Sequence, residues 1–261
     1  MKINFRKYQA TGNDFILIDN RSGQYSFSTE QVRTLCHRKF GVGADGLILI
    51  EKHPNLDFDL VYFNSDGSQS LCGNGSRAAV EMARTLGMVS GKVRFNAYDG
   101  EHEAEMLGEN LIRLRMNDVT EINKIGEDLF LNTGSPHYVR FVGKIEEHPV
   151  YEDGKVIRYH DAFKPGGTNV NFVEVLADNT IYVRTYERGV ENETLSCGTG
   201  VTAAALAASF LGYKSPMKVG TLGGELLVEF KSGQDAGSPA LFTDIFLIGP
   251  AKMVFEGQLE L

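Results

Sequence analysis

The chain has 261 residues and a net charge of −8, and 42% of its residues are hydrophobic. That length can bury the core of one large domain or of two moderate ones. The acidic balance argues against a nucleic-acid partner, and the longest apolar run, residues 201–211, is too short to cross a bilayer. The N-terminal residues lack the features of a signal peptide, so we expect a soluble cytoplasmic protein with no membrane partner.

Short strands with alternating apolar residues dominate the chain, and few helices are predicted. In chain order, strand patterns lie at residues 2–8, 56–63, 111–116, 180–187 and 240–249. A surface helix is predicted at residues 28–39, where Ser28 as N-cap and Gln31 three residues later form a capping box.

The motif GVGADG at residues 41–46 matches the Gly-x-Gly-x-x-Gly fingerprint of dinucleotide-binding folds. That fingerprint requires a strand before the glycines and a helix after them. Here a helix pattern precedes the glycines and the apolar strand LILIE follows, so we predict no dinucleotide site.

Two of the three cysteines, Cys72 and Cys197, stand in almost the same sequence setting. Each begins a Cys-Gly-polar-Gly turn, and the small-residue helix pattern that follows ends fifteen residues later at Gly87 or Gly212. Glycine at that place is typical of a left-handed helix C-cap. The remaining Cys36 lacks such a setting and is interpreted as structural. Three scattered cysteines and dispersed histidines predict neither a disulfide framework nor a metal site.

Further matches flank the two cysteine turns. A Gly-Glu-x-x-x-Glu-apolar pattern follows at residues 100–106 and again at 224–230, and residues 12–19 faintly resemble residues 168–175. This ordered series indicates an internal repeat whose period is too long for a solenoid. We therefore predict an α+β fold of two pseudo-symmetric halves, each a curled mixed sheet or barrel around a central helix.

The seam between the halves is predicted near residues 117–120. The first half then covers residues 1–117 and the second half residues 118–249. The last segment, 250–261, is predicted to be a strand that returns to the first half.

A thiol at the start of a helix faces backbone N–H groups that have no partner within the helix, and it also faces the positive end of the helix dipole. Both effects favour the thiolate and lower the pKa of the thiol below its usual value of about 8.5. Two such thiols from pseudo-symmetric halves suit inversion at a carbon, because one removes a proton while the other delivers a proton to the opposite face. An α-amino acid is the natural substrate. No lysine motif indicates pyridoxal phosphate, so we predict no cofactor.

Other readings of the same residues are structural. A cysteine that begins a glycine-rich helix is often only a small buried hydrophobe, but burial does not require matched glycines around both thiols. His137 is either an acid–base helper or a turn histidine with satisfied hydrogen bonds. Glu187 and Arg188 either grip a ligand or form an exposed pair at the end of a strand.

Five blocks together resemble the diaminopimelate epimerase family, over essentially the whole chain. They are ATGNDFILID, GVGADGLI, YFNSDGSQSLCGNGSRAA, TNVNFV and YERGVENETLSCGTG, at residues 10–19, 41–48, 62–79, 168–173 and 186–200. The resemblance implies two similar halves, each a curled mixed sheet around a central helix. It also implies a homodimer that interconverts LL- and meso-diaminopimelate without pyridoxal phosphate, in lysine and peptidoglycan precursor biosynthesis.

By the same resemblance, Cys72 and Cys197 are the two acid/base thiols, and backbone N–H groups after each thiol hold the reacting carboxylate. The substrate-binding positions implied are Asn13, Asn64, Gly73, Asn74, Asn169, Glu187, Arg188, Gly198 and Thr199. The chain departs from the family pattern at two positions. Ser135 stands where many members have asparagine before Pro-His, and Gly46 stands where some members have glutamine.

Three alternatives remain open at this point. A proline or hydroxyproline racemase of the same superfamily would use the same two-thiol chemistry. A cysteine hydrolase or transferase would use one of the thiols as its only nucleophile. A non-catalytic binder or redox switch would join the two thiols as a reversible disulfide.

Overall fold

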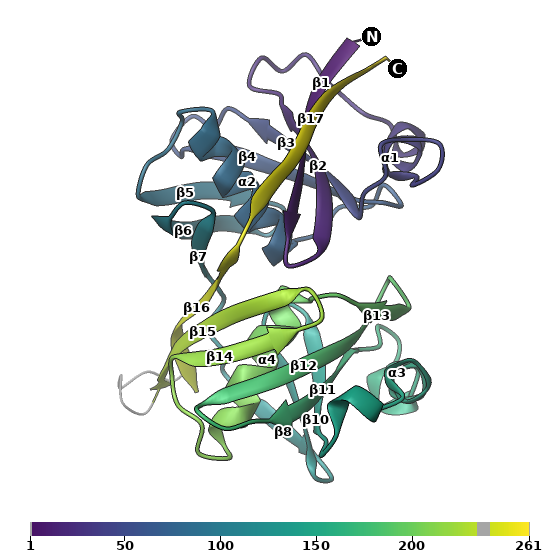
Figure 1. Cartoon of the computed structure of the whole chain (residues 1–261), viewed down its shortest axis with the longest axis vertical. Coiled ribbons are helices and arrows are strands. Elements are labelled where there is room, and N and C mark those ends of the chain that lie inside the picture. Colours follow the sequence, from purple (N-terminus) through teal and green to yellow (C-terminus); the bar gives the residue numbers. More distant parts are fainter. Residues whose placement is uncertain (1, 234–240, 261) are drawn as a thin grey trace. The chain divides into compact units, whose positions relative to one another are not determined.

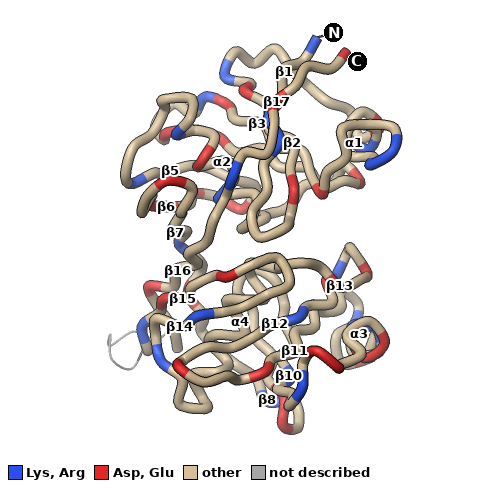
Figure 2. Tube along the Cα trace, in the orientation of Figure 1, with Lys and Arg blue, Asp and Glu red and all other residues tan. Residues whose placement is uncertain are grey.

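The computed structural model describes residues 2–233 and 241–260, and the chain divides into two compact units (Figure 1). Unit 1 comprises Met1–Leu114 and Gly249–Leu261, and unit 2 comprises Arg115–Ile248. Strands are far more numerous than α-helices among the described residues, as expected for this α+β fold. Figure 2 shows acidic and basic positions interspersed along both units.

Unit 1 is a mixed sheet of eight strands with the order β17-β1-β2-β3-β4-β5-β6-β7. The pairs β2–β3 and β4–β5 are parallel, and helices α1 and α2 make these two crossovers. Its elements are β1 (Lys2–Ala10), β2 (Asn13–Asp19), α1 (Thr29–Cys36), β3 (Gly46–Glu51), β4 (Phe58–Asn64), α2 (Gly73–Thr85), β5 (Lys92–Ala97), β6 (Gly100–Gly108), β7 (Leu111–Arg115) and β17 (Lys252–Glu260).

Unit 2 repeats this order with β8-β9-β10-β11-β12-β14-β15-β16, and β13 adds to β12. Again the parallel pairs, β10–β11 and β12–β14, are the ones joined through helices, α3 and α4. Its elements are β8 (Ile122–Ile125), β9 (Asp128–Asn132), β10 (Pro136–Phe141), α3 (Val150–Arg158), β11 (Asn169–Val175), β12 (Thr180–Glu187), β13 (Asn192–Thr194), α4 (Gly198–Ser209), β14 (Met217–Thr221), β15 (Gly224–Ser232) and β16 (Phe242–Pro250), with short 3₁₀ turns at Ile145–Glu147 and Asp161–Phe163. The strand pattern predicted from residue 240 is thus seen from Phe242, and residue 240 itself lies outside the described residues.

The internal repeat is confirmed, because both units have the same strand order and the same alternation of parallel and antiparallel pairs. The two Gly-Glu-x-x-x-Glu patterns fall on equivalent strands, β6 and β15. One predicted match is wrong: residues 12–19 form β2, whose equivalent is β10, whereas residues 168–175 contain β11, whose equivalent is β3. Both strands are buried along a continuous run, so similar apolar residues there do not indicate equivalent positions.

Each unit wraps its sheet around one helix. Helix α2 packs against β1, β2, β3 and β4, and α4 packs against β9, β10, β11, β12, β14 and β15. Nearly every residue of α4 is buried, as its apolar sequence predicts for a helix covered on all sides. The second helix of each unit, α1 or α3, covers the other face of the sheet over its own apolar cluster.

Local signals in the sequence correspond to the observed caps. Ser28 and Gln31 form both hydrogen bonds of the predicted capping box at the start of α1. Gly87 and Gly212 follow α2 and α4 with φ angles of 70° and 93°, a region that side chains other than glycine rarely occupy. The GVGADG motif lies between α1 and β3, which is the reverse of the dinucleotide-binding order. No helix within the described residues is long and apolar enough to cross a membrane.

Candidate active site

Cys72 is the N-cap residue of α2, with an extended backbone (φ −133°, ψ 108°). Its Sγ accepts a hydrogen bond from the backbone N–H of Gly75 at 3.4 Å. A Cβ atom at Gly75 would lie 3.2 Å from Cδ1 of Ile48 and 3.5 Å from Cε1 of Phe15, so glycine lets this turn approach the sheet closely. The repeated glycine therefore places the half-buried thiol where the first N–H groups of the helix point.

Asn13 connects Cys72 to a neighbouring amide. Its Oδ1 accepts from Cys72 Sγ at 3.7 Å and from Asn74 Nδ2 at 3.2 Å. Its Nδ2 donates to Asp45 Oδ2 at 2.6 Å. Unit 1 thus brings together Cys72, Gly73, Asn74 and Asn13 from β2 and the start of α2. Asn64, at the end of β4, donates instead to the hydroxyls of Ser68 and Ser70, at 3.0 and 3.1 Å.

Cys197 occupies the equivalent place in unit 2, as the N-cap of α4 with φ −120° and ψ 112°. Unlike Cys72, its side chain makes no hydrogen bond that caps the helix. Its Sγ lies 3.5 Å from the hydroxyl of Thr199, which in turn lies 2.8 Å from Nε2 of His137. A Cβ atom at Gly200 would lie 2.4 Å from Oδ1 of Asn171, so this glycine also permits close packing of helix and sheet.

The hydrogen bonds around His137 define its tautomer. Asn171 uses its Nδ2 to reach both the carbonyl oxygen of Tyr138 at 3.0 Å and His137 Nδ1 at 3.1 Å, while its Oδ1 accepts from Thr185. Nδ1 of His137 is therefore an acceptor, and the ring proton resides on Nε2. Nε2–H then donates to the hydroxyl oxygen of Thr199, which leaves the hydroxyl proton able to point toward Cys197 Sγ, 3.5 Å away. A hydroxyl that donates to sulfur favours the thiolate over the thiol.

His137 is fully buried on β10 rather than placed in a turn. Burial and the positive charge of Arg188 lower the pKa of His137 to about 3, although its hydrogen bond with Asn171 opposes the shift. The imidazole is accordingly neutral at neutral pH, which agrees with the tautomer assigned above.

The other predicted residues of unit 2 meet at the ends of β11 and β12. Asn169 accepts from the backbone N–H of Arg188 at 2.8 Å and donates to the carbonyl of Pro136 at 3.1 Å. The carboxylate of Glu187 accepts from the hydroxyl of Thr194 at 2.9 Å. Asn169 thus fixes the backbone beside Arg188, a link that spacing alone did not predict.

Close packing against β4 explains the glycine at position 46. A Cβ atom there would lie 2.4 Å from Cε2 of Tyr62 and 2.7 Å from the carbonyl oxygen of Phe63. No side chain fits at this position without moving β4. Ser135 precedes β10, and its carbonyl oxygen accepts from the backbone N–H of Thr133 at 3.2 Å.

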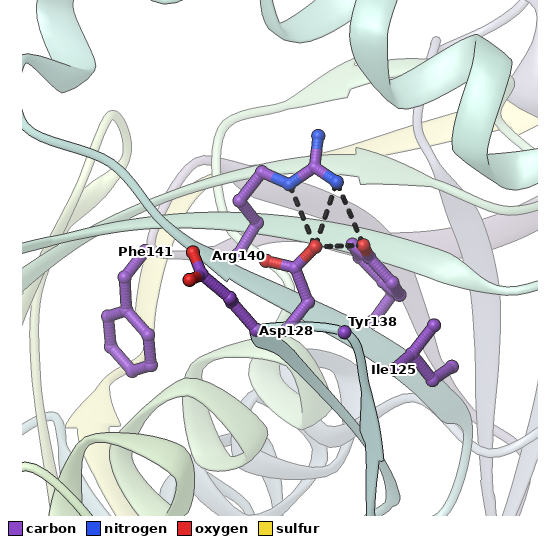
Figure 3. A pocket seen from close by; sticks show the side chains of 7 residues that line it. Ile125, Asp128, Tyr138, Arg140 and Phe141 are labelled. Carbon is purple, nitrogen blue, oxygen red and sulfur yellow. Dashed lines mark hydrogen bonds and ion pairs between the residues drawn. The ribbon is translucent and has the colours of Figure 1, made fainter.

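A further polar pocket in unit 2 lies away from these residues (Figure 3). Arg140 donates to Asp128 at 2.8 Å and to the hydroxyl of Tyr138 at 2.9 Å, and that hydroxyl also donates to Asp128. Tyr138 neighbours His137 on β10, so its side chain points to the opposite face of the sheet from α4. The three groups satisfy one another, which is typical of a structural cluster.

Cys36 lies in the apolar cluster under α1 and is 4% exposed. Burial raises the pKa of its thiol to about 12. A thiol that stays protonated in a packed core fits the structural interpretation of this residue.

Comparison with known proteins gives a consistent picture. The family model for diaminopimelate epimerase matches residues 5–122 and 129–254. The chain is 46% identical to the diaminopimelate epimerase of Flavobacterium psychrophilum, over 96% of this chain and 97% of that protein. It is 42% identical to the corresponding proteins of Chlorobaculum tepidum and Aquifex aeolicus, over 96% and 98% of this chain and 98% and 97% of theirs.

Among solved structures, a phenazine biosynthesis protein of the PhzF family from Bacillus anthracis has a TM-score of 0.77 at 15% identity, and each chain is covered completely. A probable proline racemase from Agrobacterium radiobacter has a TM-score of 0.68 at 16% identity, with 99% of this chain and 93% of that chain covered. At these identities the likeness concerns the fold alone, and it confirms the predicted two-part curled-sheet architecture.

Proposed function

The chain belongs to the diaminopimelate epimerase family, and from this premise we propose that it interconverts LL- and meso-diaminopimelate. The observation that carries the proposal is the family match, which runs through both cysteine turns and almost the whole chain. The product would serve lysine and peptidoglycan precursor biosynthesis.

In the proposed reaction, Cys72 and Cys197 transfer protons at the α-carbon of the substrate. The thiolate of one cysteine removes the α-proton, and the thiol of the other protonates the opposite face of the planar carbanion. The roles exchange in the reverse direction. Both thiols stand at helix starts, where unpaired N–H groups and the helix dipole stabilise negative charge.

The same helix starts supply donors for the reacting carboxylate. Backbone N–H groups of Gly73, Asn74, Gly198 and Thr199 are proposed to stabilise the charge that spreads onto this carboxylate in the carbanion. The remaining predicted residues bind the substrate's amino groups and its second carboxylate. They are Asn13, Asn64, Asn169, Glu187 and Arg188, with His137 as the helper that orients Thr199 beside Cys197.

We propose that this chemistry needs no cofactor. Of the lysines in the described residues, Lys7 is the buried one, and its ammonium group is paired with Asp14 at 2.7 Å, so it is not available for a Schiff base with pyridoxal phosphate. The homodimer and the cytoplasmic location are proposed from the family resemblance.

Incubation of the purified protein with LL-diaminopimelate in D₂O tests the proposal. Proton NMR should show loss of the α-proton signal with formation of the meso isomer, because the delivered proton comes from a thiol that exchanges with solvent. L-Proline in the same assay tests the racemase alternative. Turnover of proline alone, or release of meso product without solvent deuterium, would contradict the proposal.

A further inference from the structure

Arg77 on α2 is a fully buried arginine without an acidic partner among the described residues. Its Nη2 donates to Oδ1 of Asn74 at 2.9 Å and to the hydroxyl of Thr11 at 3.3 Å. Its Nε and Nη1 have no hydrogen-bond partner within the described residues. An unpaired buried charge destabilises a fold, and ionisable groups perturbed in this way cluster at functional sites.

The charge is present at neutral pH. Burial lowers the pKa of Arg77 to about 10, and the negative charge of an ionised Cys72 opposes that shift. Cys72 begins the same helix, five residues earlier. It is the titrating group whose charge acts on this guanidinium.

Other charged and titratable groups around α2 are already engaged or remote. Glu81, one turn further along the helix, is paired with Arg84 at 2.6 Å. The strands packed on α2 direct the phenols of Tyr8 on β1 and Tyr62 on β4 toward this side of the sheet, and β2 and β3 direct apolar side chains there. The charged side chains of β17 are exposed to solvent. The positive charge of Arg77 is thus left for the Cys72 thiolate.

Arg77 also begins a hydrogen-bond chain whose direction is fixed at both ends. Arginine can only donate, so Asn74 must present Oδ1 to Arg77 and Nδ2 to Asn13. An ionised carboxylate can only accept, so Asn13 must present Nδ2 to Asp45 and Oδ1 to Asn74 and Cys72. Loss of Arg77 removes one of the contacts that hold the amide of Asn74 in this orientation.

We propose that Arg77 is a positioning residue of this site. Its fixed positive charge stabilises the thiolate form of Cys72, and its hydrogen bond orients the amides of Asn74 and Asn13. The assignment of a catalytic role to Cys72 rests on the proposed function, but the effect of Arg77 on the thiol does not.

The test is the pH dependence of alkylation of Cys72 by iodoacetamide, followed by mass spectrometry of the peptide that contains it. Arg77→Met removes the charge and keeps an apolar stem of similar length. We expect the midpoint of alkylation to rise by about one to two pH units, and the rate at pH 7 to fall at least about tenfold. Arg77→Lys keeps a cation whose pKa burial brings closer to neutrality than that of arginine, so its midpoint should lie between those of wild type and Arg77→Met.

Arg33→Met is the matched control, because it removes the same charge from an exposed position on α1. An unchanged Cys72 midpoint in folded Arg77→Met protein overturns the proposal. Should that variant not fold, Arg77→Gln, which is neutral but polar, takes its place: an unchanged midpoint overturns the proposal, and a higher midpoint supports it. Alkylation does not depend on turnover. Failure of the proposed epimerase function can therefore be distinguished from failure of the role proposed for Arg77.

Discussion

At Cys72 the side-chain partner of the thiol is the carbonyl oxygen of Asn13, whereas at Cys197 it is the hydroxyl of Thr199. The carbonyl can only accept, so it favours the protonated thiol. The hydroxyl oxygen of Thr199 accepts from His137 Nε2–H, so its own proton can be donated to Cys197, which favours the thiolate. The two units therefore share the position of the thiol at a helix start but differ in the groups that set its protonation state. One half balances an acceptor against a buried cation, and the other uses a relay of neutral groups.

The strongest test of this comparison replaces each thiol in turn. Cys72→Ser and Cys197→Ser should each lower kcat/KM for LL-diaminopimelate by about a thousandfold, because an alcohol is a far weaker acid and base than a thiol. Cys36→Ala is the control and should retain nearly full activity, since Cys36 lies in the core under α1. Very unequal effects of the two serine variants would favour a single-nucleophile enzyme instead.

Thr199→Val removes the hydroxyl donor of Cys197 and leaves the other half-site unchanged. A hydrogen bond to a charged group contributes about 1.5–3 kcal/mol, so iodoacetamide should alkylate Cys197 about 10- to 100-fold more slowly at pH 7. Thr199→Ser keeps the hydroxyl and should react close to the wild-type rate. Equal rates in the valine and serine variants would show that the relay from His137 does not reach the thiol.

Acid stability should differ between the halves through His137. Its pKa is lowered from 6.5 in the unfolded chain to about 3 in the folded one, so the unfolded state binds the extra proton between these values. Stability is therefore complete above pH 6.5 and declines as the pH falls toward 3. Between pH 6.5 and 5 the decline amounts to about 2 kcal/mol.

The free energy of unfolding in urea, measured at pH 7.5 and at pH 5, gives this decline. Hydrogen exchange of the amides on β10 locates it in unit 2. His137→Gln should remove most of it. Part of the decline should persist, because burial also lowers the pKa of His148 in the same unit. A pH dependence that the substitution leaves unchanged would contradict the burial of a neutral His137.

The smallest expected effect has the opposite sign to that of Thr199→Val. Asn13→Ala removes the acceptor of the Cys72 thiol, so iodoacetamide should alkylate Cys72 about fivefold faster, as the loss of one ordinary hydrogen bond predicts. Turnover should fall nevertheless, because Asn13 is also a proposed substrate contact. Slower alkylation would mean that Asn13 does not stabilise the protonated form.

Local chemistry made part of this site predictable. The glycines after Cys72 and Cys197, and those that follow each helix, allowed both helix starts and both ends to be predicted, because close packing and positive φ leave few alternatives to glycine. The surroundings of the thiols were not predictable. Asn171 and Thr185, which determine the tautomer of His137, are adjacent only through pairing of β11 with β12.

Two features were missed for identifiable reasons. Helix α3 carries Gly154 in its middle, which disfavours a helix in sequence terms, yet a Cβ atom there would lie 2.5 Å from Cβ of Tyr186. The burial of Arg77 was not predicted, because arginine is rarely fully buried. A comparison of the two cysteine motifs could have identified it. The first motif has Arg77 where the second has the uncharged Thr202.

Strand β17 pairs with β1 along its whole length, with Lys2 opposite Glu260, yet unit 2 lies between these strands in the chain. Unit 2 is thus an insertion into unit 1. Unit 2 is one continuous segment of the chain, whereas unit 1 is formed from two separate segments. During synthesis on the ribosome, every residue of unit 2 emerges before β17 is made, while β1 still exposes an unpaired edge. We expect unit 2 to fold first, and the host sheet to close only when the last strand arrives.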